Sequence, residues 1–150
     1  MLRMMLTMAA VAIGVSAVAA QDPVTARREL MKHAGEQAYG VLNRMVRDQT
    51  PYDQAKVDEA FAQLADAAQK IPSLFPPGSY TGPVAESRYY ASEKIFENQA
   101  DLKARATKLA KSIADAKGKV KDLDSLKAIW TTINKEECDS CHTPYRLRKN

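Results

Sequence analysis

Residues 124–142, near the C-terminus, read DSLKAIWTTINKEECDSCH. Apolar side chains recur every three or four residues along this stretch, which is the spacing of an amphipathic helix. Asp124 or Ser125 can cap its N-terminus, and no proline or glycine interrupts it before Cys141. The residues that share one face are Leu126, Ile129, Trp130, Ile133 and Glu137. We therefore predict a helix that continues through Cys141.

Three earlier segments have the same helical periodicity. Their expected ranges are 24–49, 53–71 and 92–116. Asp22-Pro23 is a favourable start for the first, because proline fits the first turn of a helix. Asp53 and Ser92 can cap the second and third helices with their side-chain oxygens.

Residues 71–91 contain four prolines and two glycines and form the one long connection that we expect. No segment alternates between apolar and polar residues for long enough to predict a strand. Four amphipathic helices pack naturally around a common core. The predicted fold is therefore all-α, an antiparallel four-helix bundle.

The N-terminus has the order of a secretory signal peptide. One positive charge, Arg3, precedes an apolar run from Leu6 to Val18, and small residues follow it. The run is shorter than the roughly 20 apolar residues that a membrane-spanning helix needs. We expect cleavage after Ala19 or Ala20, at the end of a signal peptide that covers residues 1–20. Residues 21–150 are then one domain, exported to the periplasm without a permanent membrane anchor.

Composition excludes several classes of protein. Loss of Arg3 with the signal peptide reduces the net charge from +4 to +3, and charges of both signs are interspersed, which argues against nucleic-acid binding. Two cysteines are too few for a disulfide scaffold, although export brings them into an oxidising compartment. We find no glycine-rich phosphate loop and no Ser/His/Asp set, and we predict that the protein is not an enzyme.

The pentapeptide Cys138-Asp139-Ser140-Cys141-His142 is the most specific feature of the sequence. C-x-x-C-H is the attachment signature of a c-type haem. On a helix Cys138 lies three residues from Cys141 and four from His142, so all three side chains point to one side. The thiols can add to the haem vinyl groups as thioethers while the imidazole binds the iron. The motif predicts one covalently bound haem c.

Three other interpretations of the pentapeptide compete with haem attachment. A thiol-disulfide enzyme would usually place C-x-x-C at a helix N-terminus after a strand, whereas here it falls late in a helix. A structural zinc site needs four ligands, and the only other histidine is His33. The third interpretation is a chance occurrence with inert cysteines. The thiol-disulfide hypothesis predicts a protein without visible absorbance even when haem is supplied.

The position of the motif, nine residues from the C-terminus of a four-helix chain, resembles the class II cytochromes c, the cytochrome c′ and cytochrome c-556 group. Cytochrome c′ is itself a standard example of the four-helix bundle. The stretches that carry the resemblance are RRELMK (27–32), PYD (51–53), LFP (74–76) and CDSCHTPYR (138–146). The resemblance covers essentially all of residues 21–150 and implies the same fold and a haem c held near the C-terminus.

The resemblance also implies where the second axial ligand lies. In this family it comes from the first helix, four positions after an arginine, and counting from Arg27 gives Met31. High-spin members carry an apolar residue there, and low-spin c-556 members carry methionine. Met31 begins the apolar stripe of its helix, although ordinary core packing is the alternative role for a methionine. His33 points elsewhere, because residues two apart do not share a face, and we expect it on the surface.

Two arginines are candidates for contacts with the haem propionates. Arg27 lies one turn before Met31, and Arg146 lies four residues after His142. Arginine binds carboxylates with two parallel hydrogen bonds, although a solvated charge is the alternative for both. Pro144 departs from the family pattern, since it removes a backbone donor toward the Ser140 carbonyl and should kink or loosen the helix.

The leading hypothesis is an electron-transfer cytochrome with His142 and Met31 as axial ligands, whose partners are redox proteins. His/Met ligation raises the reduction potential of the iron. The alternative is a high-spin cytochrome c′ that binds nitric oxide or carbon monoxide, and Met31 separates the two. Members of the family vary in dimerisation, so a homodimer through the first two helices stays open.

Overall fold

The computed structural model describes residues 22–85 and 87–150; the signal peptide predicted for residues 1–20 lies outside these residues. The helices are α1 (Pro23–Gly35), the π-helix η1 (Glu36–Leu42), α2 (Asn43–Val46), α3 (Gln54–Lys70), the 3₁₀-helix η2 (Ile71–Leu74), α4 (Lys94–Glu97), α5 (Gln99–Ala116), α6 (Leu123–Ile133), the π-helix η3 (Asn134–Asp139) and α7 (Ser140–Tyr145). The strands are β1 (Tyr89–Ala91) and β2 (Arg146–Arg148).

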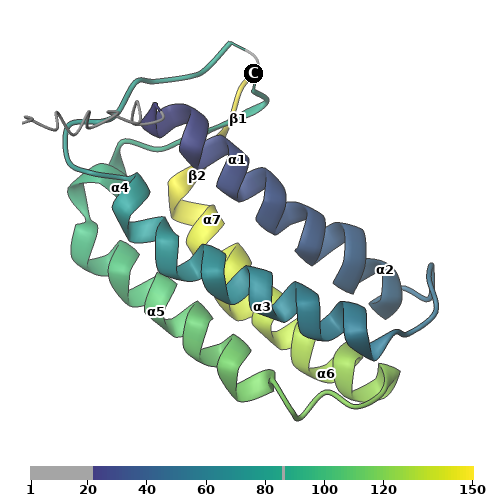
Figure 1. Ribbon diagram of the computed structural model, residues 1–150. Coiled ribbons are helices and arrows are strands. Elements are labelled where there is room, and N and C mark those ends of the chain that lie inside the picture. The colour runs from purple at the N-terminus through teal and green to yellow at the C-terminus, as the bar shows by residue number, and fades with distance from the viewer. Residues whose placement is uncertain (1–21, 86) are drawn as a thin grey trace, which may run out of the picture.

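These elements form four long rods, each antiparallel to the one before it (Figure 1). The first rod joins α1, η1 and α2, the second is α3, the third is α5, and the fourth joins α6, η3 and α7. The predicted all-α, antiparallel four-helix bundle is confirmed. Within the residues that the structure describes, no helix is both long and apolar enough to cross a membrane.

Two helix starts follow from local chemistry as predicted. Asp22 accepts a hydrogen bond from the backbone N–H of Thr25 at 3.0 Å, and Pro23 occupies the first turn. Asp53 accepts from the N–H of Lys56 at 3.2 Å and begins α3. In both cases a short acidic side chain satisfies an amide that the helix itself leaves without a partner.

Two other helix starts were predicted wrongly. The cap of α6 is Asp122, not Asp124 or Ser125; Asp122 and Ser125 form a reciprocal capping box. Ser92 does not cap the third long helix, which begins only at Gln99 after the short α4. The Gln99 side chain donates to the carbonyl of Phe75 at 2.7 Å, so a contact with a distant loop accompanies the break before α5.

The expectation of no strand was also wrong. β1 and β2 pair antiparallel, with Tyr89 opposite Arg148 and Ala91 opposite Arg146. The N–H of Ser92 extends the pairing by donating to the carbonyl of Tyr145 at 2.8 Å. Three residues are too few to leave a periodic pattern in the sequence. The pair attaches the long connection to the segment that directly follows the haem motif.

The main core lies where α2, the start of α3, the end of α5 and α6 meet. Trp130 is fully buried there, and its ring centroid lies 6.3 Å from that of Phe61. The indole N–H of Trp130 donates to Oδ1 of Asn43 at 2.7 Å, so the one polar atom of the indole is satisfied. This packed end holds the four rods together and leaves the opposite end of the bundle for the site.

Candidate functional site

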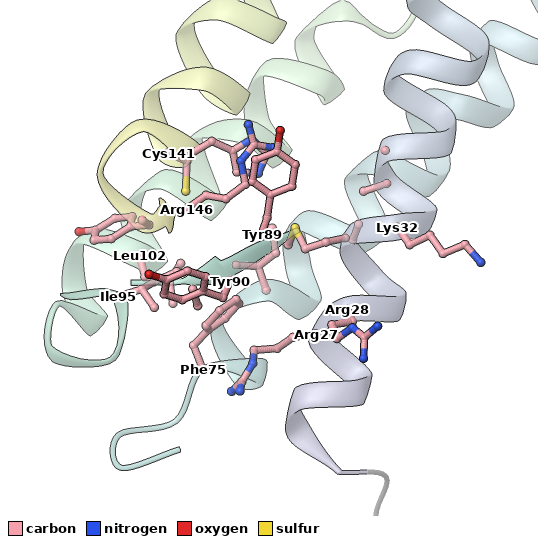
Figure 2. A pocket seen from close by; sticks show the side chains of 18 of the residues that line it. Arg27, Arg28, Lys32, Phe75, Tyr89, Tyr90, Ile95, Leu102, Cys141 and Arg146 are labelled. Atoms are coloured by element: carbon pink, nitrogen blue, oxygen red, sulfur yellow. The ribbon is translucent and has the colours of Figure 1, made fainter. Parts of the chain in front are cut away.

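A cavity of about 510 Å³ lies at the end of the bundle opposite Trp130. Side chains from all four rods line it, including Met31 of α1, Leu64 of α3, Leu102 of α5 and Cys141 of α7. The connection between η2 and α4 adds a further wall. Figure 2 shows Cys141 and Arg146 on one side of the cavity and α1 with Arg27 on the other. The volume falls within the range typical of small-molecule and cofactor sites, roughly 300–1,000 Å³.

The pentapeptide faces this cavity. Cys138 lies at the end of η3, Cys141 and His142 lie in α7, and all three line the cavity wall. Both cysteines are free thiols. The sequence-predicted geometry, three reactive groups on one side of a helix, is therefore present, and it spans the junction of a π-helix with an α-helix. Short π-helical stretches are frequent at functional sites.

Burial keeps both thiols protonated. It raises the pKa of Cys138 to about 12, and the negative charges of Asp139 and other neighbours act in the same direction. Burial also raises the pKa of Cys141, although the nearby Arg105 guanidinium opposes this. A thiol-disulfide enzyme needs the reverse, because its nucleophile is a stabilised thiolate. The surroundings of these cysteines argue against the thiol-disulfide hypothesis.

The surroundings of His142 favour the neutral imidazole that a metal ligand requires. Burial lowers its pKa, and the positive charge of Arg146 lowers it further, against the opposing effect of Asp139. Nδ1 of His142 is buried and has no hydrogen-bond partner within the described part of the chain. Metal ligation needs a neutral imidazole with a ring nitrogen available, and buried polar atoms seldom stay unpartnered. The residues present fit a haem held at this position.

Met31 and His33 occupy different environments on the first rod. Met31 is half-buried and lines the same cavity as His142, Cys138 and Cys141. His33 is exposed, with 53% of its side chain accessible, and its Nδ1 lies 3.9 Å from the Glu36 carboxylate. The cavity therefore receives the methionine and not the histidine, in agreement with the helical geometry of the sequence.

Arg27 is buried at the cavity wall and holds the loop that follows η2. Its Nη1 donates to the carbonyl of Leu74 and to Oγ of Ser79, both at 3.0 Å. Its guanidinium carbon lies 5.2 Å from the ring centroid of Phe75 and 5.1 Å from that of Phe96. The hydrogen bonds to Leu74 and Ser79 come from Nη1 and Nη2, and Nε–H takes no part in them. Burial lowers the pKa of Arg27, but an arginine stays charged.

Arg146 lies on the other side of the cavity, at the start of β2. It is exposed, and its guanidinium carbon is 4.8 Å from the ring centroid of Tyr89 in β1. This cation–π contact crosses the same strand pair that joins the two segments. Arg146 and Arg27 thus place positive charge on two different walls of the cavity, and each remains a predicted propionate contact.

The chain is similar to known proteins along most of its length. A family model described as cytochrome C′ matches residues 22–146. Cytochrome c-555 of Bradyrhizobium diazoefficiens is 36% identical over 149 residues, 99% of each chain. Cytochrome c-556 of Rhodopseudomonas palustris is 37% identical over 97% of each chain. The chain belongs to the cytochrome c′ family.

Structure comparison agrees with this assignment. The solved cytochrome c′ of Rhodopseudomonas palustris superposes with a TM-score of 0.75 at 33% identity, covering 86% of this chain and 98% of that one. Members of the family bind one haem c covalently and are generally electron carriers. The relatives include both cytochromes c-556 and a cytochrome c′. Membership of the family therefore does not decide the second axial ligand of this cytochrome.

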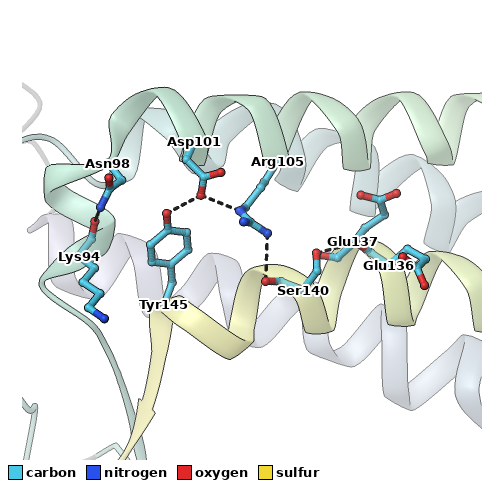
Figure 3. A network of polar contacts seen from close by, with 8 residues as sticks. All are labelled: Lys94, Asn98, Asp101, Arg105, Glu136, Glu137, Ser140 and Tyr145. Carbon is cyan, nitrogen blue, oxygen red and sulfur yellow. Dashed lines mark hydrogen bonds and ion pairs between the residues drawn. The ribbon is translucent and has the colours of Figure 1, made fainter.

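Sequence reasoning missed one polar network beside the site. Asp101 and Arg105 of α5 connect to Ser140 and Tyr145 of α7 (Figure 3). The four-residue spacing of Asp101 and Arg105 indicates an ion pair, but nothing in the sequence indicates that the pair reaches α7. Pro144 was the available signal, because the hydrogen bond that it removes needs a substitute donor.

Pro144 lies inside the last helix, close to its end. The helix continues for one residue beyond it and ends at Tyr145, which is buried. The N–H of Arg146 then donates to the carbonyl of His142, closing the helix end. The Ser140 carbonyl accepts a hydrogen bond from Arg105 of α5 at 3.1 Å, and Cys141 and His142 lie on the cavity wall.

Proposed function

We propose that this cytochrome is a periplasmic electron carrier whose low-spin haem iron is held by His142 and Met31. The observation that carries the proposal is that both side chains, from α7 and α1, line one cavity together with Cys138 and Cys141. Two potential iron ligands, from the first and the fourth rod, then share a site with the two thiols of the attachment motif. The export signal predicted for residues 1–20 supports the periplasmic location.

Each residue of the site has a defined role in this proposal. Cys138 and Cys141 form the two thioether links, at thiols whose pKa burial raises. His142 presents a neutral imidazole as the proximal ligand. Haem c supplies one-electron chemistry between the ferric and ferrous states.

Met31 decides between an electron carrier and a gas-binding protein. A thioether is a soft ligand, and His/Met ligation raises the reduction potential. Ligation by Met31 would leave carbon monoxide or nitric oxide no free position on the iron. It also leaves the ligand set unchanged between oxidation states, which keeps reorganisation small and suits electron transfer.

Arg27 and Arg146 act as propionate partners in this proposal. Arg27 keeps its Nε–H outside the contacts with Leu74 and Ser79, and Arg146 is exposed at the cavity wall. An arginine–carboxylate contact is a charge-assisted hydrogen bond, stronger than a neutral one. Two arginines on different walls would fix the orientation of the haem and would balance the negative charge of its propionates.

The test is the visible spectrum of the purified protein, oxidised and reduced, with and without carbon monoxide. Sharp reduced bands that carbon monoxide does not change are expected for six-coordinate, low-spin iron. A broad high-spin spectrum that shifts with the gas would overturn Met31 ligation and favour a gas-binding cytochrome c′. Haem that a denaturing gel removes would overturn the covalent attachment at Cys138 and Cys141.

A further inference from the structure

Pro144 interrupts the hydrogen bonding of the helix that carries Cys141 and His142. In an α-helix the N–H of residue 144 donates to the carbonyl of residue 140, and proline has no N–H. The Ser140 carbonyl accepts a hydrogen bond from Nη1 of Arg105 instead, at 3.1 Å. The substitute donor thus comes from α5, 35 residues away in the sequence (Figure 3).

Arg105 is itself held in place by α5 and α7. Its Nε donates to Oδ2 of Asp101 at 2.7 Å, and the hydroxyl of Tyr145 donates to the same oxygen. The guanidinium carbon lies 5.8 Å from the ring centroid of Tyr145. These hydrogen bonds join Asp101 and Arg105 of α5 to Ser140 and Tyr145 of α7 in one network. Tyr145 lies one residue beyond Pro144. The Arg105 guanidinium, hydrogen-bonded at both Nε and Nη1, has little rotational freedom left.

Arg105 also lies on the cavity wall. It lines the cavity with Cys141, His142 and Tyr145. Its counter-charge, Asp101, is 41% exposed at the side chain and is not among the residues that line the cavity. The cation therefore faces the site more closely than its partner does.

We infer that Arg105 is a positioning residue for the Cys141–His142 segment, and that it places a positive charge beside the haem. The inference rests on the proposed function of Cys141 and His142. Hydrogen bonds behind a metal ligand fix its orientation, and a fixed cation stabilises the state that carries the extra electron. Arg105 then raises the reduction potential and supports the helix at the point where Pro144 weakens it.

The test compares four haem-loaded proteins: wild type, Arg105→Met, Pro144→Ala and the double variant. Arg105→Met loses both the donor and the charge, so the reduction potential falls and the thermal midpoint drops by a few degrees. Pro144→Ala restores a backbone donor to Ser140. In the double variant the thermal midpoint recovers, while the potential stays low because the charge is still missing.

Two further variants separate charge from geometry. Arg105→Lys keeps the charge but not the planar fork, so the potential stays near that of wild type while part of the thermal stability is lost. It also supplies the test if Arg105→Met does not mature. Lys111→Met is the matched control, because Lys111 pairs with Asp115 on the same helix at the same four-residue spacing. It leaves both the potential and the visible spectrum unchanged.

An Arg105→Met protein with the wild-type potential, or a double variant without thermal recovery, would overturn the inference. A wild-type protein without covalent haem would overturn both the inference and the proposed function. The test compares each variant with the wild type, and the differences in potential and thermal midpoint are expected whether or not Met31 binds the iron. A wild-type spectrum that responds to carbon monoxide would therefore overturn only the Met31 assignment and leave this test intact.

Discussion

The two ends of the bundle are built from the same four rods but serve different purposes. At one end Trp130, Leu42 and Leu126 are fully buried, and the one polar atom of the indole has its partner in Asn43. At the other end the rods surround a cavity that His142 lines together with Cys138 and Cys141. The packed end supplies stability, which allows the other end to keep a site that apolar packing does not fill.

The comparison predicts that substitutions at the cavity end change the chemistry, while those at the packed end change the free energy of unfolding. Met31 and Met45 make the contrast clear, because both are methionines of the first rod. Met31 lines the cavity, and Met45 is 2% exposed in the main core.

Replacing both Cys138 and Cys141 with alanine should abolish covalent haem completely, because no thiol remains for a thioether link. Haem staining after denaturing gel electrophoresis measures the loss. Ser140→Ala, within the same pentapeptide, is the control and should keep the stain. Stained haem in the double alanine variant would contradict the attachment assignment.

Met31→Leu should convert the iron to a high-spin form that binds carbon monoxide, since leucine fills a similar volume but cannot ligate. Volume-conserving apolar exchanges usually cost less than about 1.5 kcal/mol, so the fold should persist. Visible spectra with and without the gas measure the change. Met45→Leu is the matched control and should keep the wild-type spectrum. Identical spectra for the two variants would contradict the division between the cavity end and the packed end of the bundle.

Trp130→Ala should destabilise the protein by about 3–5 kcal/mol, because it leaves a cavity in the main core. It also leaves Oδ1 of Asn43 without its donor. Urea unfolding followed by far-ultraviolet circular dichroism gives the free energy of unfolding. The visible spectrum of the folded fraction should not change. A shifted spectrum would mean that the packed end also shapes the haem site.

Lys127→Met should have the smallest effect. Nζ of Lys127 lies 2.9 Å from both carboxylate oxygens of Asp48, but the pair is partly exposed. Pairs of this kind contribute about 0.2–1 kcal/mol, and salt screens them. Urea unfolding at low and high ionic strength should show a difference from wild type that shrinks with salt. A loss as large as that of Trp130→Ala would show that the surface pair is part of the packed end.

The starts of α1 and α3 could be predicted because each is determined by a local contact. The start of α6 is equally local, but there the cap is Asp122 and not its neighbours Asp124 or Ser125. Asp22 and Asp53 cap their helices through amides three residues away, so a local pattern is sufficient. The start of α5 involves the Gln99 side chain and the carbonyl of Phe75, 24 residues earlier. Contacts over that distance leave no periodic signal in the sequence. For this reason the sequence predicts Ser92 as the cap of the third long helix, whereas the helix begins at Gln99.

The haem motif could be predicted from the sequence because, like the caps of α1 and α3, it depends only on residues close together in the chain. Cys138, Cys141 and His142 lie within five residues, so helical geometry alone puts them on one side. The role of Met31 came from resemblance to a family, and the structure adds that Met31 and His142 line one cavity. Arg105 could not be found this way, because its contact with Ser140 joins residues 35 positions apart.

The amino-acid sequence by itself determined the helical character of the four rods, the attachment motif and the face on which Met31 lies, because these depend on neighbours within a turn or two. Only the tertiary structure decided which donor replaces the missing N–H of Pro144 and how the strand pair ties the long connection to the C-terminus. It also decided which side chains enclose the cavity. Those features depend on how rods distant in sequence pack together, and packing is a property of the whole bundle.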